Sequence, residues 1–481
     1  MANHGPTAPR FFQAFLPLIL VLLPMFAPSS VLATGEKSPS SFKDVQAAYE
    51  QRHYDRALAL VEPFVHDGGQ GLDALRLKAR SLVHLGRPVD ALAVYDQVVA
   101  KLGKDDMALL HDVAFGFIVV VLKDMREQMR GAGYSALKEV PSDETIPYFL
   151  DGLSDGSGLV RALAAEGLGR LKPGAHTARL KKALEDQAAI VRVAVLKSLG
   201  RSRDRSQIPV VESALKDEQV TVRIAASGAL VMLGRTEAWA QVREAAEAQN
   251  PEDRAAALRM LGDLEDRRAL PLLQQALTHA QPSVRGAAAT ALGSLKDPAA
   301  GPALVKALHD SIPGVRTAVA VSLGEVAASE SAAALKESLL DPNPAVRAAS
   351  VSALLHLGTP IAEVVDTVMT LTRNTDPGIR ASAGRALSQA HGKDRAEAVE
   401  VLRLLLEDPL PRPRIAAARS LGHLSNPELR QEQRREIIAI LKNGLKDKDE
   451  AVRATVGGAL IRALGAAEQD QPAKGRSPGG S

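Results

Sequence analysis

One arginine recurs along most of this chain at a fixed interval, and this repeat limits the possible folds more than any other feature. From Arg130 to Arg347, eight arginines follow one another every 31 residues. Looser spacings of 33, 34 and 39 residues then lead to Arg380, Arg414 and Arg453. A period of roughly 20–50 residues is typical of repeat proteins, in which each copy is too small to bury its own apolar face. The sequence therefore predicts eleven copies of one small unit.

The residues around each arginine indicate a helix. Leucine follows seven residues later in all eleven units, and valine directly precedes the arginine in seven. Apolar positions spaced by four residues line one helix face. Proline lies three residues before the arginine in six units, where it fits the first helical turn, and we expect the glycine found eight residues after it in six units to end the helix. A second helix precedes each one, for example within residues 207–217 and 300–310.

Stacked helix pairs of this kind predict an all-α chain, an α-solenoid of antiparallel helix pairs. Neighbouring helices lie ~8–10 Å apart, so eleven units predict a curved rod roughly 100 Å long. All Phe and Tyr residues lie at or before Phe149, and Trp239 is the one aromatic residue after it. The core must therefore consist of small and aliphatic side chains, and the alanine that often follows the arginine by two residues lets helices approach closely.

The units DPNPAVRAASVSAL (341–354) and DSIPGVRTAVAVSLG (310–324) carry a resemblance. Residues 124 to about 465 are similar to HEAT-like repeats of the phycobilin-lyase type. The resemblance implies an α-solenoid used mainly as a protein-binding scaffold, although a few members of the family are enzymes. Deoxyhypusine hydroxylase binds iron through His-Glu pairs, and none of the eleven histidines here precedes a glutamate. The bilin lyases work in the cytosol, which fits poorly with the secretory signal that residues 1–33 indicate, as described below.

The N-terminus has the pattern of a secretory signal over residues 1–33. Arg10 precedes an apolar run from Phe11 to Ala27, and Val31 and Ala33 place small residues before a cleavage point. An uncleaved anchor is the alternative, although Pro17 and the marginal length of the run argue against a span. We therefore expect an exported protein, periplasmic in a bacterium or extracellular, without a stable membrane span after cleavage.

Three further segments follow. Residues 34–110 resemble tetratricopeptide repeats, because Ala57 and Ala91 are 34 residues apart and Tyr54, Gly86 and Tyr95 fit that pattern. Residues 111–464 form the predicted HEAT-like array, in which residues 113–122 are expected to be a buried helix that joins the two parts. Residues 465–481 are polar and rich in Gly and Pro, and are predicted to be a disordered tail.

Composition excludes several functions. The 59 basic residues nearly balance the 56 acidic ones, so nucleic acid is not an expected partner. The chain has no cysteine, which rules out disulfides, thiol catalysis and thiolate metal sites. We find no motif for catalysis, for a cofactor or for a metal, and predict no residue in those roles and no cofactor.

An aspartate lies six residues before the repeat arginine in eight units. It is expected in the turn between the two helices, where it can accept backbone N–H bonds and meet an arginine of its own or an adjacent unit. Because catalysis does not need one pair many times over, we interpret these residues as a structural ladder, with ligand binding along it as the alternative. The predicted ladder comprises Asp124, Arg130, Asp155, Arg161, Asp186, Arg192, Asp217, Arg223, Arg285, Asp310, Arg316, Asp341, Arg347, Arg380, Asp408, Arg414, Asp447 and Arg453.

The unit around Arg254 departs from the pattern. Ala248 and Asp253 replace its aspartate and valine, and Trp239 lies in its first helix. The indole either fills a gap in a degenerate repeat or anchors a partner. The positions five residues after each arginine carry no stripe of one charge, although Arg385 and Arg419 make the C-terminal third more basic. Trp239, Arg385 and Arg419 are thus the candidate partner contacts.

The sequence as a whole predicts an exported, non-catalytic scaffold or adaptor that binds protein or peptide partners along a curved surface. A lyase- or hydroxylase-like oxidoreductase of the HEAT-repeat kind is one alternative. Weak polyanion binding through the C-terminal third is another.

Overall fold

The structure is a computed structural model that describes residues 41–469, except 141, 173, 175–176 and 426–428. The described residues form helices, turns and loops without a strand, which confirms the all-α prediction. Within that part of the chain, no helix is both long and apolar enough to cross a membrane. The signal segment predicted at residues 1–33 lies outside the described residues.

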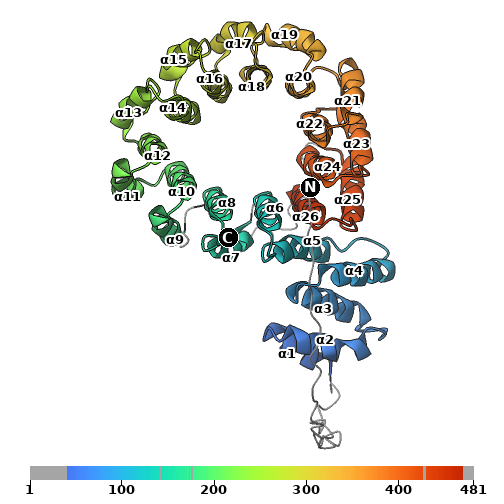
Figure 1. The fold of residues 1–481 in the computed structure, drawn as a ribbon. Helices are drawn as coiled ribbons and strands as arrows, with labels where there is room; N and C mark the ends of the chain where they lie inside the picture. Colours follow the sequence, from blue (N-terminus) through green and yellow to red (C-terminus); the bar gives the residue numbers. More distant parts are fainter. Residues whose placement is uncertain (1–40, 141, 173, 175–176, 426–428, 470–481) are drawn as a thin grey trace, which may run out of the picture.

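Two short helix pairs begin the described chain and project from the rest of the molecule (Figure 1). They are α1 (Phe42–Glu50), α2 (Tyr54–Val61), α3 (Gly71–His84) and α4 (Pro88–Leu102). Ala57 and Ala91 are both buried where these helices pack, and Gly86 takes a positive φ of 71° in the turn between α3 and α4. The next helix, α5 (Met107–Val121), packs against both α3 and α4, and so continues this stack.

The remaining helices form a closed ring with an inner and an outer layer (Figure 1). The outer layer holds α5, α7 (Ile146–Gly152), α9 (Thr177–Lys182), α11 (Ile208–Ser213), α13 (Trp239–Ala245), α15 (Leu270–Ala276), α17 (Gly301–Ala307), α19 (Ser331–Glu337), α21 (Val365–Thr372), α23 (Asp394–Leu405) and α25 (Gln431–Gly444). The inner layer holds α6 (Glu127–Leu137), α8 (Gly158–Leu168), α10 (Ala189–Arg201), α12 (Val220–Met232), α14 (Pro251–Asp263), α16 (Pro282–Leu295), α18 (Pro313–Val326), α20 (Pro344–His356), α22 (Pro377–Leu387), α24 (Pro411–Leu424) and α26 (Glu450–Gln469). Every repeat arginine lies on an inner helix, and the six repeat prolines begin theirs, as predicted.

Only one of the six repeat glycines ends its helix as predicted: Gly169 caps α8, whereas the other five lie inside their helices, so the prediction was wrong for them. Gly262 and Gly324 lie inside α14 and α18, where the next inner helix approaches them. A Cβ at Gly262 would lie 2.6 Å from the Cα of Ala291, and one at Gly324 would lie 2.9 Å from the Cα of Ala353. Glycine is needed at these positions because backbone meets backbone across the unit interface.

Ring closure also corrects the predicted rod. Consecutive inner helices pack directly on one another, whereas most outer helices contact their outer neighbours little. Each unit is thereby turned in the same sense relative to the one before, and one full circle shared among eleven units is roughly 33° per unit. Helix α26 completes the circle by packing against α24 on one side and against α5 and α6 on the other.

We call the contact of α26 with α5 and α6, where the two ends of the array meet, the seam. Two glycines and several ion pairs lie there. A Cβ at Gly457 would lie 2.6 Å from the carbonyl oxygen of Ala114, and one at Gly458 would lie 2.8 Å from that of Ala136. Ion pairs link the two ends of the array as well: Arg126–Glu450 at 2.6 Å, Lys442–Asp105 at 2.7 Å and Arg462–Glu139 at 2.6 Å. Helix α26 continues to Gln469, so the predicted tail begins five residues too early, and its residues 470–481 lie outside the described part.

Candidate functional site

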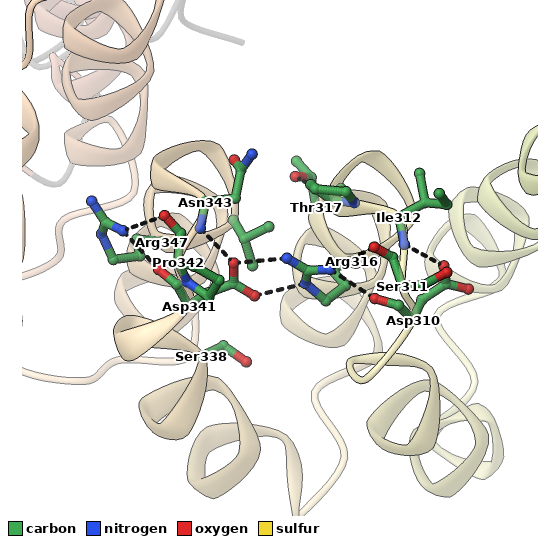
Figure 2. Close-up of polar contacts among 12 residues, drawn as sticks. Asp310, Ser311, Ile312, Arg316, Thr317, Ser338, Asp341, Pro342, Asn343 and Arg347 are labelled. Atoms are coloured by element: carbon green, nitrogen blue, oxygen red, sulfur yellow. Dashed lines mark hydrogen bonds and ion pairs between the residues drawn. The ribbon is translucent and has the colours of Figure 1, made fainter.

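The arginines and aspartates of the repeat lie along one edge of the ring and join neighbouring units. At most of the unit interfaces, the arginine reaches forward to the aspartate of the next unit, as Arg316 does to Asp341 (Figure 2). The guanidinium binds both carboxylate oxygens, with Nε–Oδ2 distances of 2.6–2.8 Å and Nη2–Oδ1 distances of 2.8–3.0 Å. The described residues hold seven such pairs: Arg130–Asp155, Arg161–Asp186, Arg192–Asp217, Arg285–Asp310, Arg316–Asp341, Arg380–Asp408 and Arg414–Asp447.

Each pair is also tied to the backbone. Arg316 Nη1 donates to the carbonyl oxygens of Asp310 and Ser311, in the turn of its own unit. The Asp341 carboxylate accepts the N–H of Asn343, two residues on, at the start of α20. The hydrogen bond from Arg285 holds the pKa of Asp310 below its usual value. The side chains of Arg316 and Asp341 are 12% and 10% exposed, so the pair is largely shielded from water. This arrangement fixes one unit against the next.

Three interfaces lack the carboxylate. Arg347 faces the unit whose aspartate position is Asn374, and Arg254 faces His279. Arg223 faces Ala248, which has no polar group to offer. Arg347 and Arg223 keep the bonds to the carbonyl oxygens of their own turn, and neither has an ion pair with a described residue.

The ladder does not continue across the seam either. Asp124 binds Arg126, with an Oδ2–Nη2 distance of 2.8 Å, in place of a repeat arginine. Arg453 donates to the carbonyl oxygen of Asp447, and its guanidinium lies 5.9 Å from the centre of the Phe117 ring. The two ends of the array therefore meet through different contacts from those within it.

Trp239 packs against the core and is partly covered. The guanidinium of Arg268 lies 4.5 Å from the centre of its indole, and Arg268 is in turn paired with Asp266 at 2.5 Å. The indole nitrogen is buried and has no hydrogen-bond partner among the described residues. This environment resembles that of a core residue more than that of an exposed anchor.

The inner helices present a continuous surface on the side away from the outer helices, which we call the inner wall. Its residues lie five and nine positions after the repeat arginines, and include Glu139, Glu166, Arg170, Lys197, Arg201, Arg259, Asp263, Thr290, Ser294, Val321, Glu325, Ser352, His356, Arg385, Arg419, His423 and Arg462. The pair between Lys197 of α10 and Asp263 of α14, at 2.8 Å, spans past α12 because both side chains point to the same inner side.

The carboxylates of the inner wall form ion pairs with Lys or Arg side chains, whereas several of its arginines have no carboxylate partner among the described residues. Glu166 binds Lys138 at 2.8 Å, and Glu139 binds Arg462 at 2.6 Å. Among the described residues, Arg201 and Arg259 have no carboxylate within ion-pair distance. The inner wall is therefore locally positive.

The two predicted arginines belong to this wall. Arg385 on α22 is exposed, and its Nη2 donates to Ser382 Oγ. Partial burial and the nearby charges of Arg412 and Arg419 lower the pKa of Arg385 from its ordinary value. Arg419 is 3.9 Å from Glu139, which lies across the seam. Arg412, which sequence reasoning missed, completes a group of three arginines on neighbouring inner helices; its position before the repeat arginine gave no signal that it would lie beside Arg385.

A shallow hollow of about 580 Å³ lies on the same wall between α14, α16 and α18. Its lining includes Asp263, Thr290, Val321 and Glu325, and no residue of an outer helix. Val321 is 49% exposed there. The wall thus offers an apolar contact beside charged ones, a combination suited to a protein surface or an extended peptide.

The described residues contain no group of three or more His, Asp or Glu side chains that could hold a metal ion. Among the described histidines, His111 has a strongly raised pKa, about 9, because its interactions with the carboxylates of Asp112 and Glu144, 3.8 and 3.3 Å away, outweigh its burial. His111 lies on α5 and Glu144 lies in the turn before α7, so this contact of 3.3 Å joins the two segments and has a structural role.

The family model described as HEAT repeats matches residues 177–248, 240–324, 302–355 and 333–422, which together span more than half of the chain. No curated protein sequence matches the chain.

Solved structures with a similar fold include human deoxyhypusine hydroxylase in complex with glycerol, at 22% identity and a TM-score of 0.30, over 52% of this chain and 98% of that one. Another is the CpcE–CpcF complex of phycocyanin lyase from Nostoc, at 20% identity and a TM-score of 0.35, over 56% and 94%. A third is a structure of Kap95p with RanGDP, at 11% identity and a TM-score of 0.36, over 90% and 65%. Similarities at this level carry no argument about the activity of this chain.

Proposed function

The chain belongs to the HEAT-repeat family, and on this basis we propose that it is a non-catalytic scaffold that holds a protein or peptide partner against the inner wall of its ring. The observation that carries the proposal is the inner wall itself. Its carboxylates are paired, several of its arginines are free, and it has an exposed apolar residue in a shallow hollow. An extended surface of this kind binds by area and by complementary charge, with no need for a catalytic group.

The positive charge of the inner wall restricts the kind of partner that can bind to it. Arg385 is exposed and has no ion pair with a described residue, and the charges of Arg412 and Arg419 act on it, so an acidic segment placed beside these arginines would be attracted to them. We therefore propose a partner with an acidic stretch that follows α22 and α24.

Site-specific photo-crosslinking in cells tests the surface. A photoreactive residue at Val321 on inner helix α18 is compared with one at Lys306 on outer helix α17 of the same unit, and both positions are exposed. We expect a defined protein adduct from Val321, identified by mass spectrometry, and a much weaker one from Lys306. Adducts from Lys306 alone would place the partner on the outer face and contradict the proposal.

The enzymatic alternative has its own test. Metal analysis and an absorption spectrum of the purified protein would reveal bound iron or a chromophore. Stoichiometric iron or a visible absorption band would overturn the non-catalytic proposal in favour of a hydroxylase- or lyase-like enzyme.

Polyanion binding is a second candidate, favoured by the three arginines of α22 and α24. Retention on heparin with a steep salt dependence, lost in Arg385→Gln/Arg412→Gln, would support it over an acidic protein. Elution at low salt would dismiss it.

We also propose that the protein is exported, on the strength of the apolar run that follows Arg10. Cell fractionation of the full-length chain, with Leu20→Arg as a variant that interrupts the run, should show export of the first and retention of the second.

A further inference from the structure

The interface between the units of Arg223 and Arg254 is unlike the others. Ten of the eleven units have Ala, Gly or Ser six residues after the repeat arginine, and the unit of Arg254 has Met260 there. A Cβ at Gly228 would lie only 2.1 Å from Met260 Sδ, so this thioether fills the space opposite a glycine of α12. The larger side chain separates α12 and α14, and the two helices contact each other less than their neighbours do.

Arg223 keeps the conformation of an intact ladder arginine at this interface. Its Nη1 donates to the carbonyl oxygens of Asp217 and Glu218 at 2.7 and 3.0 Å, as Arg316 Nη1 does to Asp310 and Ser311. These two bonds fix the plane of the guanidinium. In Arg316 the remaining Nε–H and Nη2–H groups bind Asp341 (Figure 2), whereas in Arg223 they have no partner among the described residues.

The other two incomplete interfaces differ in an informative way. At Arg347, the side chain of Asn374 occupies the aspartate position and accepts the N–H of Asp376, so the place is filled. At Arg254, the guanidinium is turned, and its Nε and Nη2 donate to the carbonyl oxygens of Ala248 and Glu247. Arg453, at the seam, also lacks a carboxylate, but the Phe117 ring lies 5.9 Å from its guanidinium. Among the described repeat arginines inside the array, Arg223 therefore combines a fixed guanidinium with an unfilled aspartate position.

A hollow of about 670 Å³ opens at this position. It is bounded by the start of α12, by α13 and by the turn that holds Ala248, and Arg223 lies in its lining. Leu215 and Ile224 give it an apolar wall, while Ser227 and Gln241, joined by a hydrogen bond of 2.9 Å, give it a polar one. The unit interface is therefore open where the missing aspartate would have been.

We propose that this hollow is a binding site for a carboxylate group, supplied by an aspartate or glutamate side chain of a peptide, which takes the place of the missing ladder aspartate. The guanidinium fork is preorganised for a bidentate carboxylate. The exposed carboxylates of Glu244 and Glu247 lie in the same lining and repel a run of negative charge, so the site selects a single acidic residue flanked by neutral or basic ones. It lies away from the inner wall and does not depend on the function proposed for that wall.

The chain's own ladder supplies the probe. An acetylated, amidated peptide with the sequence of residues 308–312, LHDSI, presents the aspartate of an intact turn, and the matched peptide carries Asp310→Asn. Isothermal titration calorimetry measures the binding of each peptide to the full-length protein. We expect saturable binding of the aspartate peptide and affinity at least about tenfold lower for the asparagine peptide.

Two variants test the site. Ala248→Asp supplies the missing carboxylate within the chain, so it should raise the melting temperature and weaken peptide binding at least about tenfold. Asn374→Asp fills the incomplete interface at Arg347 with the same added charge and should leave peptide binding unchanged. Arg223→Gln removes the guanidinium without adding a carboxylate and should abolish peptide binding. This variant provides the test if Ala248→Asp does not fold.

Equal binding of the two peptides, or full binding to Ala248→Asp or Arg223→Gln, would overturn the proposal. The absence of binding to the wild-type protein at about 5 mM peptide would also overturn it. A dissociation constant above that concentration means a binding free energy too small for a selective site. The peptide experiments do not depend on the crosslinking at Val321. Failure of the scaffold proposal and failure of this proposal can therefore be distinguished.

Discussion

At the scale of the residue, the repeat arginine has two tasks. It binds the carbonyl oxygens of its own turn, and it binds the aspartate of the next unit. Arg316 performs both tasks and Arg347 performs only the first, because Asn374 replaces the aspartate. The two arginines therefore separate the energetic value of the turn from that of the link between units.

Replacement of Arg316 by alanine should lower the free energy of unfolding by about 3 kcal/mol, since it leaves the largely shielded Asp341 carboxylate without its partner. Arg347→Ala should cost about 1 kcal/mol, because no buried carboxylate is left behind. Urea denaturation followed by circular dichroism measures both. Equal losses for the two variants would show that the link between units contributes nothing beyond the turn.

His111 makes a second, pH-dependent contribution. Its pKa rises from 6.5 to about 9 in the folded chain, through its interactions with the carboxylates of Asp112 and Glu144. Since the folded pKa is the higher one, the stabilisation is complete below pH 6.5 and disappears as the pH rises through about 9. The wild type should thus be more stable than His111→Gln at pH 6, and this difference should vanish near pH 10. A constant difference across that range would mean that His111 acts through packing alone.

At the scale of the element, α26 differs from the other inner helices because it has neighbours from opposite ends of the array. It meets α24 before it in the chain, and α5 and α6 from the start of the array. Gly457 and Gly458 allow this approach, since each faces a backbone carbonyl that cannot move aside as a side chain can.

Gly457→Val should therefore open the seam. Its Cβ would lie 2.6 Å from the carbonyl oxygen of Ala114, so α26 must move away from α5. Small-angle X-ray scattering should then give a larger maximum dimension and radius of gyration than for the wild type. Gly286→Val on α16 is the matched control, because a Cβ there meets nothing within 4 Å. Unchanged scattering from Gly457→Val would show that the seam tolerates a larger separation.

At the scale of the whole molecule, closure gives every unit two neighbours. In an open solenoid the terminal units have one neighbour each, and they fray first because stability is carried by unit interfaces. Here the apolar faces that would be exposed at both ends cover each other, with α26 packed on α5 and α6. The N-terminal helix pairs are coupled to the same junction, through α5 and through the pair between Lys442 and Asp105.

This coupling predicts uniform protection in hydrogen exchange. Amides of α6 and α26 in the wild type should be protected as strongly as those of α16, which lies far from the seam. In Gly457→Val, protection should fall in α6 and α26 and stay the same in α16. Weak protection at the seam of the wild-type protein would mean that the ring opens readily in solution.

Much of the fold was predictable because it is set by local patterns that occur eleven times. The spacing of leucine and valine around each arginine predicts the inner helices, and proline at the first turn predicts where six of them begin. The same reasoning failed for most of the glycines. Gly262 lies where a helix could end, and its real role depends on Ala291 of the next unit, which a single unit does not reveal.

The candidate sites were predictable only in part. The aspartates and arginines could be identified as partners, but the choice between the same and the adjacent unit depended on the stacking of two units. Arg385 and Arg419 were visible in the sequence, whereas their grouping with Arg412 follows from the way α22 packs on α24. Trp239 was visible too, and its cover by Arg268 was not.

The sequence by itself determined the unit, its period, its helices and the residues that join one unit to the next, because those depend on contacts repeated at a fixed spacing. The tertiary structure decided that the array closes on itself, and that Arg223 faces an open carboxylate position. Closure depends on the sum of small rotations over all the interfaces, and on the fit of Gly457 and Gly458 against α5 and α6. No repeat carries that sum within its own residues, so it can be known only when all the units are placed together.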